Sequence, residues 1–73
     1  MIRKIPLKDA QEIVRSYLIA NDPSTAISIR DGLGDVARTF PRYIHDIIRS
    51  MYLEGMLVRI PIEGSRKYLY DIR

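Results

Sequence analysis

The 73-residue sequence predicts an α+β fold in which three helices precede a C-terminal β-hairpin. The clearest observation is an apolar stripe at helical spacing, three and four residues apart. It consists of Ile44, Ile47, Ile48 and Met51. Gly55 follows this segment, and glycine readily takes the left-handed conformation that ends a helix. Beyond it, apolar and polar residues alternate over 58–63 and 67–72. Gly64 and Ser65 separate these stretches, which is typical of two strands joined by a turn.

The first helix is expected to end near Ala20. Pro6 fits its first turn, because the missing proline N–H would have no helical partner there. Pro23 ends the helix region, because proline disfavours helical conformation in the residue before it. The apolar face of this helix consists of Leu7, Ala10, Val14, Tyr17 and Leu18.

A second helix of about nine residues is expected to end at Leu33, with Ser24 or Thr25 as its N-cap. Its apolar face consists of Ala26, Ile29 and Leu33. The residues over 25–29 also alternate in polarity, so a short strand just before or within this segment is the competing prediction.

The third helix is expected to span residues 41–53. Thr39 is a suitable N-cap and Pro41 fits the first turn. The outward positions carry groups that hydrogen-bond to base edges, with few of the Glu and Lys residues that usually solvate a surface. These outward residues are Arg42, Tyr43, His45, Asp46 and Arg49.

A helix that ends in Glu54-Gly55-Met56-Leu57-Val58 and continues into a basic-tipped hairpin resembles the second half of a winged helix-turn-helix domain. Members of that superfamily often show an apolar core pattern that runs into Glu-Gly-Leu-Val, and Ile44, Ile48 and Met51 fit its positions. The resemblance implies one domain over residues 1–73 and accommodates a short strand before the second helix. Segment 35–39 is longer than the tight turn of most members, which leaves the angle between the second and third helices open.

Two interpretations of the exposed face of the third helix remain open. In the first, Arg42, Tyr43, His45, Asp46 and Arg49 contact DNA bases, with arginine bidentate to guanine and Asp46 accepting from cytosine or orienting an arginine. In the second, the face is only solvated, and Asp46 pairs with Arg42 or Arg49 at helical spacing.

The expected DNA backbone contacts lie before the third helix and along the hairpin. They are Arg38, Thr39, Arg59, Ser65, Arg66 and Lys67. The alternative is that the hairpin charges only keep an edge strand soluble and that Thr39 only caps the helix. The remaining tyrosines are expected to pack in or around the core, not to stack on bases. They are Tyr17, Tyr52, Tyr68 and Tyr70.

Charge and composition narrow the function classes. The net charge is +3, and the part from Asp35 onward holds seven basic and five acidic residues, which favours a nucleic-acid partner. With no cysteine and one histidine, the sequence offers no thiolate or multi-histidine metal site. We find no catalytic constellation, so we expect no enzyme, no cofactor and no small-molecule effector. No membrane span or signal peptide is visible, which predicts a cytoplasmic, nucleoid-associated protein.

The expected function is sequence-specific binding of double-stranded DNA by a transcriptional regulator. Helix 41–53 would enter the major groove and hairpin 58–72 would form the wing. Because one small domain buries little DNA surface, a homodimer on a symmetric site is expected. The candidate dimer contacts are Ile2, Ile5, Ile19 and Leu69.

The alternative is a winged-helix module that binds a protein of a transcription, replication or membrane-remodelling assembly. The composition, rich in Ile and Arg and poor in Asn, Gln and Cys, is typical of a thermophilic source. It resembles small single-domain regulators of archaea and their viruses or plasmids.

Overall fold

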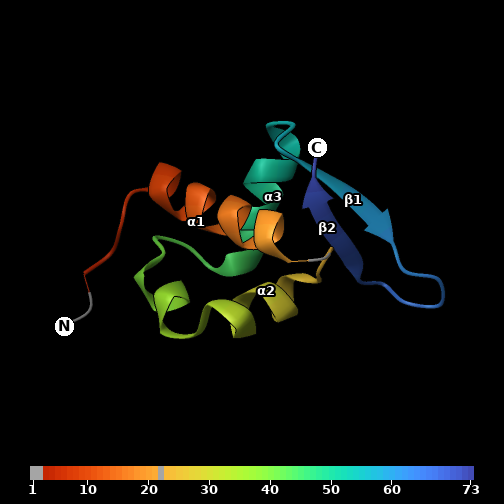
Figure 1. Ribbon diagram of the computed structural model, residues 1–73, viewed down its shortest axis with the longest axis horizontal. Helices are drawn as coiled ribbons and strands as arrows, with labels where there is room; N and C mark the ends of the chain where they lie inside the picture. Colours follow the sequence, from red (N-terminus) through yellow and green to blue (C-terminus); the bar gives the residue numbers. More distant parts are fainter. Residues whose placement is uncertain (1–2, 22) are drawn as a thin grey trace.

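The computed structural model describes residues 3–21 and 23–73, in which three α-helices precede a two-stranded antiparallel hairpin. The elements are α1 (Leu7–Ala20), α2 (Ala26–Leu33), the 3-10 helix η1 (Gly34–Thr39), α3 (Ile44–Leu53), β1 (Leu57–Pro61) and β2 (Tyr68–Ile72). Figure 1 shows the helices packed together and the hairpin extending beyond them, away from the N-terminus. The predicted α+β fold is confirmed, and its layout is consistent with a winged helix.

The hydrophobic core lies between the three helices and the base of the hairpin. Its helical members are Ala10, Val14, Leu18, Ala26, Ile29, Ile44, Ile47, Ile48 and Met51. The predicted apolar stripe of α3 is therefore confirmed. Phe40, in the linker before α3, and Leu57, the first residue of β1, are each only 2% exposed. Together they hold both ends of α3 against the core.

A buried polar side chain joins α1 to α3. Gln11 is 6% exposed, and its Nε2 donates to Ser50 Oγ and to Glu54 Oε2, each at 3.1 Å. Ser50 Oγ in turn donates to the carbonyl oxygen of Ile47 at 2.6 Å. Because buried amides are costly unless they are hydrogen-bonded, this network allows one register of α1 on α3.

A single β-bridge adds a third chain segment to the hairpin. Ser24 N–H donates to Tyr70 O at 3.1 Å, and Tyr70 N–H donates to Ser24 O at 2.8 Å. The next residue, Thr25, is the N-cap of α2, and its Oγ1 accepts from Ser28 N–H at 3.2 Å. The strand prediction and the helix prediction for this segment thus each hold in part. The strand is a one-residue bridge at Ser24, and the helix begins at Ala26, after the N-cap Thr25.

The boundaries of the first two helices agree closely with the prediction. α1 spans Leu7–Ala20, and α2 ends at Leu33 after eight residues. Gly34 follows with a φ of +60°, which a side chain would disfavour. Pro6 is the exception, because it occupies the N-cap position just outside α1 and not the first turn.

The predicted start of the third helix is wrong by three residues. α3 begins at Ile44 instead of Pro41, because the chain is still extended at Tyr43, with ψ at 148°. Phe40 is also extended, with ψ at 144°, as the residue before a proline usually is. Tyr43, and not Thr39, is the N-cap residue. The Thr39 hydroxyl instead donates to a carbonyl within η1 at 2.7 Å.

The predicted alternation within each strand agrees with the register, but the apolar residues at 58 and 60 lie on the opposite face of the hairpin from those at 68, 70 and 72. Leu57 pairs with Ile72 and Arg59 with Tyr70, so these four side chains share the face toward the helices. The position of Leu57 in the core decides this division, because successive side chains alternate. The apolar residues at 58 and 60 consequently point outward and are 36% and 41% exposed.

We predict that Ile48→Ala lowers the free energy of unfolding by about 2–5 kcal/mol, because it leaves a cavity in the core. Ile48 is 0% exposed. Leu53→Ala is the matched control on the same helix, since Leu53 is 69% exposed, and its effect should stay within about 0.5 kcal/mol. Urea denaturation measures both, and equal effects would contradict the orientation of α3.

Candidate functional site

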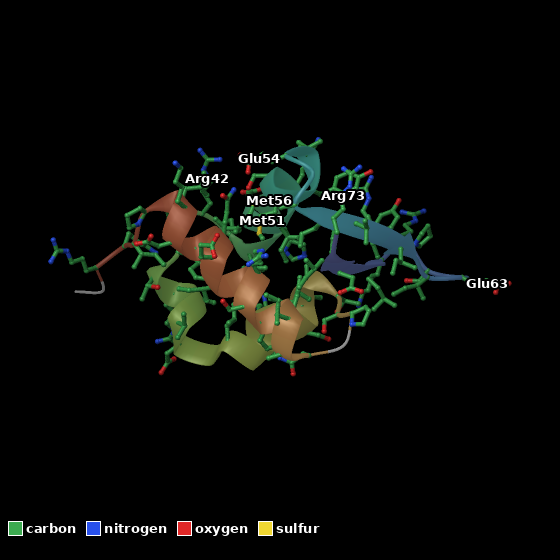
Figure 2. The ribbon with its side chains drawn as sticks, turned by 45° about the horizontal axis from the view of Figure 1, so that its top comes forward. Arg42, Met51, Glu54, Met56, Glu63 and Arg73 are labelled. Carbon is green, nitrogen blue, oxygen red and sulfur yellow. The ribbon has the colours of Figure 1, made fainter. Side chains whose placement is uncertain are left out.

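The surface of interest is the exposed side of α3 and the extended segment before it. His45, Asp46 and Arg49 lie on the helix, whereas Arg42 and Tyr43 precede it, because α3 begins at Ile44. All five predicted base-contact residues are exposed, Tyr43 the most at 83%. Figure 2 shows Arg42 over the helical part of the chain, far from Glu63 at the hairpin tip.

The five side chains share a second property, which is the lack of an intramolecular partner. In residues 3–21 and 23–73, no side-chain hydrogen bond or ion pair involves any of them. In particular, Asp46 pairs with neither Arg42 nor Arg49, although the solvated-face interpretation predicts such a pair. Their polar groups therefore remain available to another molecule.

Two hollows in the surface meet at His45. The larger, of about 850 Å³, lies between α2, η1 and the start of α3. Its Lys, Arg, Asp and His lining residues are Lys4, Arg30, Asp31, Asp35, Arg38, Arg42, His45 and Asp46. The smaller, of about 110 Å³, brings His45 together with Thr25 at the start of α2 and with Lys67 and Tyr68 of the hairpin. The fold thus places α3 and the hairpin base on one continuous surface.

Most of the cations of the larger hollow already have partners. Arg30 pairs with Asp31 at 3.5 Å and Arg38 with Asp35 at 3.8 Å. Lys4 Nζ donates to the Arg38 carbonyl at 2.9 Å. Arg38, predicted to contact DNA backbone, is therefore partly neutralised, although such exposed pairs are weak and exchange readily.

A third shallow hollow brings Arg42, Asp46 and Arg49 together with Ser50 and Leu53. Three of the predicted base-contact residues thus line one hollow, with Asp46 and Arg49 on α3 and Arg42 in the segment before it. Their mixture of donor and acceptor groups is the kind of pattern that base edges match.

At the hairpin tip, the serine takes part in the turn, whereas the two basic side chains are exposed. The chain turns at Gly64, which has a φ of +76°, and Ser65 Oγ accepts from Lys67 N–H at 3.1 Å. Ser65 therefore has a turn-forming role in addition to its predicted backbone contact. Arg66 and Lys67 are exposed, and in the described residues neither forms an ion pair.

Arg59 lies in a different environment from the other predicted backbone contacts. Its guanidinium carbon lies 4.3 Å from the ring centroid of Tyr52 and 4.4 Å from that of Tyr68. Desolvation by the surrounding groups lowers the pKa of Arg59, but a hydrogen bond with Tyr70 and the nearby tyrosines raise it to above its ordinary value. The guanidinium therefore stays charged, and we call Tyr52, Arg59 and Tyr68 the cation–π stack.

The candidate dimer contacts are dispersed. Ile2 lies outside the described residues, and Ile5 is half-buried against the core. Ile19 is 59% exposed on α1, whereas Leu69 lies on the outer face of the hairpin opposite Ile60. The described candidates Ile5, Ile19 and Leu69 therefore lie on three different segments: before α1, at the end of α1 and on β2.

Sequence reasoning missed the part that Tyr52 and Tyr68 play, because it assigned the tyrosines to packing. Tyr17 and Tyr70 do pack against the core, as predicted. Tyr52 and Tyr68 approach Arg59 from α3 and β2, and the meeting of three elements has no local sequence signal. Alternation within the hairpin, read from Leu57 onward, would have placed Arg59 on the helix-facing side.

In the described residues no group of three or more His, Asp or Glu side chains is placed to hold a metal ion. Over the same residues, every helix is too short or too polar to cross a membrane. Comparisons with protein families, curated sequences and solved structures found no match for this chain.

We predict that Arg42→Ala and Arg49→Ala each change the free energy of unfolding by less than about 0.5 kcal/mol, because neither side chain has a partner to lose. The contrasting variant is Gln11→Ala, which breaks two buried hydrogen bonds and should cost about 1–3 kcal/mol. Thermal and urea denaturation measure these changes. A large loss in either arginine variant would show that the arginine has a structural role.

Proposed function

We propose that the chain is a winged-helix transcriptional regulator that binds double-stranded DNA sequence-specifically, with α3 in the major groove. The observation that carries this proposal is the set of exposed side chains, on and before α3, that have no partner among the described residues: Arg42, Tyr43, His45, Asp46 and Arg49.

The chemistry of these groups suits direct readout of base pairs. A guanidinium can donate two parallel hydrogen bonds to guanine O6 and N7, and a carboxylate can accept from cytosine N4. Arg42, Asp46 and Arg49 would make these contacts, with Tyr43 and His45 at the adjoining bases or phosphates. The inner side of the same helix is packed at 0–5% exposure, so the outer groups are presented from a rigid support.

The hairpin would supply the sequence-independent part of the affinity. Lys67 shares a hollow with His45 of α3, so a duplex seated on α3 would bring phosphates toward Lys67. Arg66 and Ser65 lie further out along the same hairpin, and Arg38 and Thr39 lie on the η1 side. Such contacts release counterions and make affinity fall steeply with salt.

The proposal includes a homodimer on a symmetric site, because a single domain of this size covers few base pairs. Ile19 or the outer face of the hairpin would provide the apolar contact between copies. A DNA-binding regulator of this kind would act in the cytoplasm, on the nucleoid.

One observation favours a second function, which is binding to another protein. Val58 and Ile60 are 36% and 41% exposed, and with Leu69 they give the outer face of the hairpin an apolar character that DNA contact does not need. A protein-interaction module would use this face and would bind its partner with little dependence on salt.

The deciding experiment is a selection of preferred duplexes from a randomised pool, followed by anisotropy titrations of a selected and a scrambled duplex at several salt concentrations. Under the DNA-binding proposal, the selected duplex binds more tightly, and both affinities fall linearly in log K against log salt. An unenriched pool and no measurable affinity at low salt would refute DNA binding and favour the protein-binding function.

We predict distinct signatures for the two kinds of contact. Arg42→Ala or Arg49→Ala should cost about 1–3 kcal/mol on the selected duplex and relax the preference at one base pair. Arg66→Ala should weaken selected and scrambled duplexes alike and reduce the salt slope by about one unit. Anisotropy titrations measure these changes, and unaltered affinity in all three folded variants would contradict the proposed interface.

A separate prediction concerns self-association. The purified chain should sediment as a dimer at micromolar concentration, and Leu69→Lys should dissociate it if the hairpin face is the contact. Val36→Lys is the matched control, because Val36 is 42% exposed on η1, away from the hairpin. A wild-type monomer that binds DNA with full affinity would remove the symmetric-site argument.

A further inference from the structure

The cation–π stack joins three separate elements at the surface. Tyr52 is the penultimate residue of α3, Arg59 is the central residue of β1, and Tyr68 is the first residue of β2. The guanidinium carbon lies 4.3 Å and 4.4 Å from the centroids of the two rings. Arg59 therefore contacts an aromatic ring from α3 and one from β2 while it remains exposed to solvent.

The stack lies next to the outer half of the hairpin, whose residues are not packed in the hydrophobic core. At the hairpin base, Leu57 is buried, and Ile72 and Tyr70 pack against the core. Further out, Pro61 pairs with Tyr68 at the end of the ladder, and both residues are exposed. The link from Tyr68 through Arg59 to Tyr52 is thus the contact that extends from α3 toward the outer half of the hairpin.

We propose that Arg59 is a positioning residue, which through Tyr52 and Tyr68 fixes the hairpin at one angle to α3 so that both reach the same DNA duplex. This inference rests on the proposed DNA-binding function. It replaces the direct phosphate contact that the sequence predicted for Arg59.

The rigidity of the hairpin decides how much its DNA contacts add to those of α3. When two contacting elements are held rigidly, the second contact forms without a further loss of conformational freedom. When the hairpin swings freely, Lys67 must be ordered again at each binding event, and its contribution falls. Arginine is protonated at every pH at which the protein would bind DNA, so the stack keeps its cation throughout that range.

The first test measures the hairpin angle without DNA. The chain has no cysteine, so Glu12→Cys on α1 and Glu63→Cys at the hairpin tip create two clean spin-label sites. Figure 2 shows Glu63 at the end of the hairpin. Pulsed electron spin resonance should give a narrow distance distribution in this background and a broader one after adding Arg59→Ala or Tyr68→Leu. Tyr68→Phe, which keeps the ring, is the matched control and should leave the distribution narrow.

The second test uses the salt dependence of DNA binding, in proteins without spin labels. Lys67→Ala should reduce the slope of log K against log salt by about 0.9, the value for one lost phosphate contact. Tyr68→Leu removes no charge, yet it should reduce the slope by a similar amount, because Lys67 no longer reaches its phosphate. Combining Tyr68→Leu with Lys67→Ala should produce no further reduction, whereas Arg42→Ala should have the same effect with or without Tyr68→Leu.

The outcomes separate the inference from the function on which it rests. A distance distribution that stays narrow in Arg59→Ala and Tyr68→Leu overturns the inference. So does an unchanged salt slope in Tyr68→Leu, or independent losses of about 0.9 each from Arg59→Ala and Lys67→Ala, which would mark Arg59 as a direct phosphate contact. Failure of the unmodified protein to bind any duplex overturns the proposed function and the DNA-binding role of Arg59 together. The distance measurement would still show whether the stack fixes the hairpin.

Discussion

The burial of one side of α3 is the constraint on which the other features depend. Ile47, Ile48 and Met51 are completely enclosed, so the helix cannot rotate without exposing apolar surface. Phe40 and Leu57 are buried just beyond its two ends and fix where it begins and where β1 leaves it. Its position in turn sets the direction of the hairpin and the side on which polar groups are displayed.

Local rules were sufficient to predict the helices and the turn. The apolar stripe of α3, the left-handed Gly55 after it and the Thr25 cap of α2 all depend on neighbours within a few residues. The start of α3 was harder to predict, because two sequence signals in the linker before it point to different conformations. Thr39 with Pro41 resembles a helix start, yet the proline extends Phe40, and burial of Phe40 makes that extension favourable.

The arrangement of the candidate site was predictable only in part. Because His45, Asp46 and Arg49 lie opposite a strongly apolar stripe, their common exposure follows from helical periodicity. The position of Arg59 does not follow from periodicity alone, because it depends on which residue of β1 is buried in the core. A shift of one residue in a strand exchanges its two faces, and neither face of this hairpin is wholly apolar or wholly polar. The contacts of Tyr52 and Tyr68 with Arg59 join residues of three elements, which no local pattern records.

The placement of Pro61 bears on how readily a further strand could pair with the edge of β1. Ile62 N–H bonds to Lys67 O, so by the alternation of an antiparallel ladder the nitrogen of Pro61 faces the outer edge of β1, where the described residues provide no partner strand. A strand edge beside exposed valine and isoleucine is a typical starting point for uncontrolled sheet growth. Proline presents no N–H donor there, so an incoming strand would lose a hydrogen bond at the outer end of the hairpin. The same short strand can therefore carry apolar residues on its outer face and still resist stacking into fibrils.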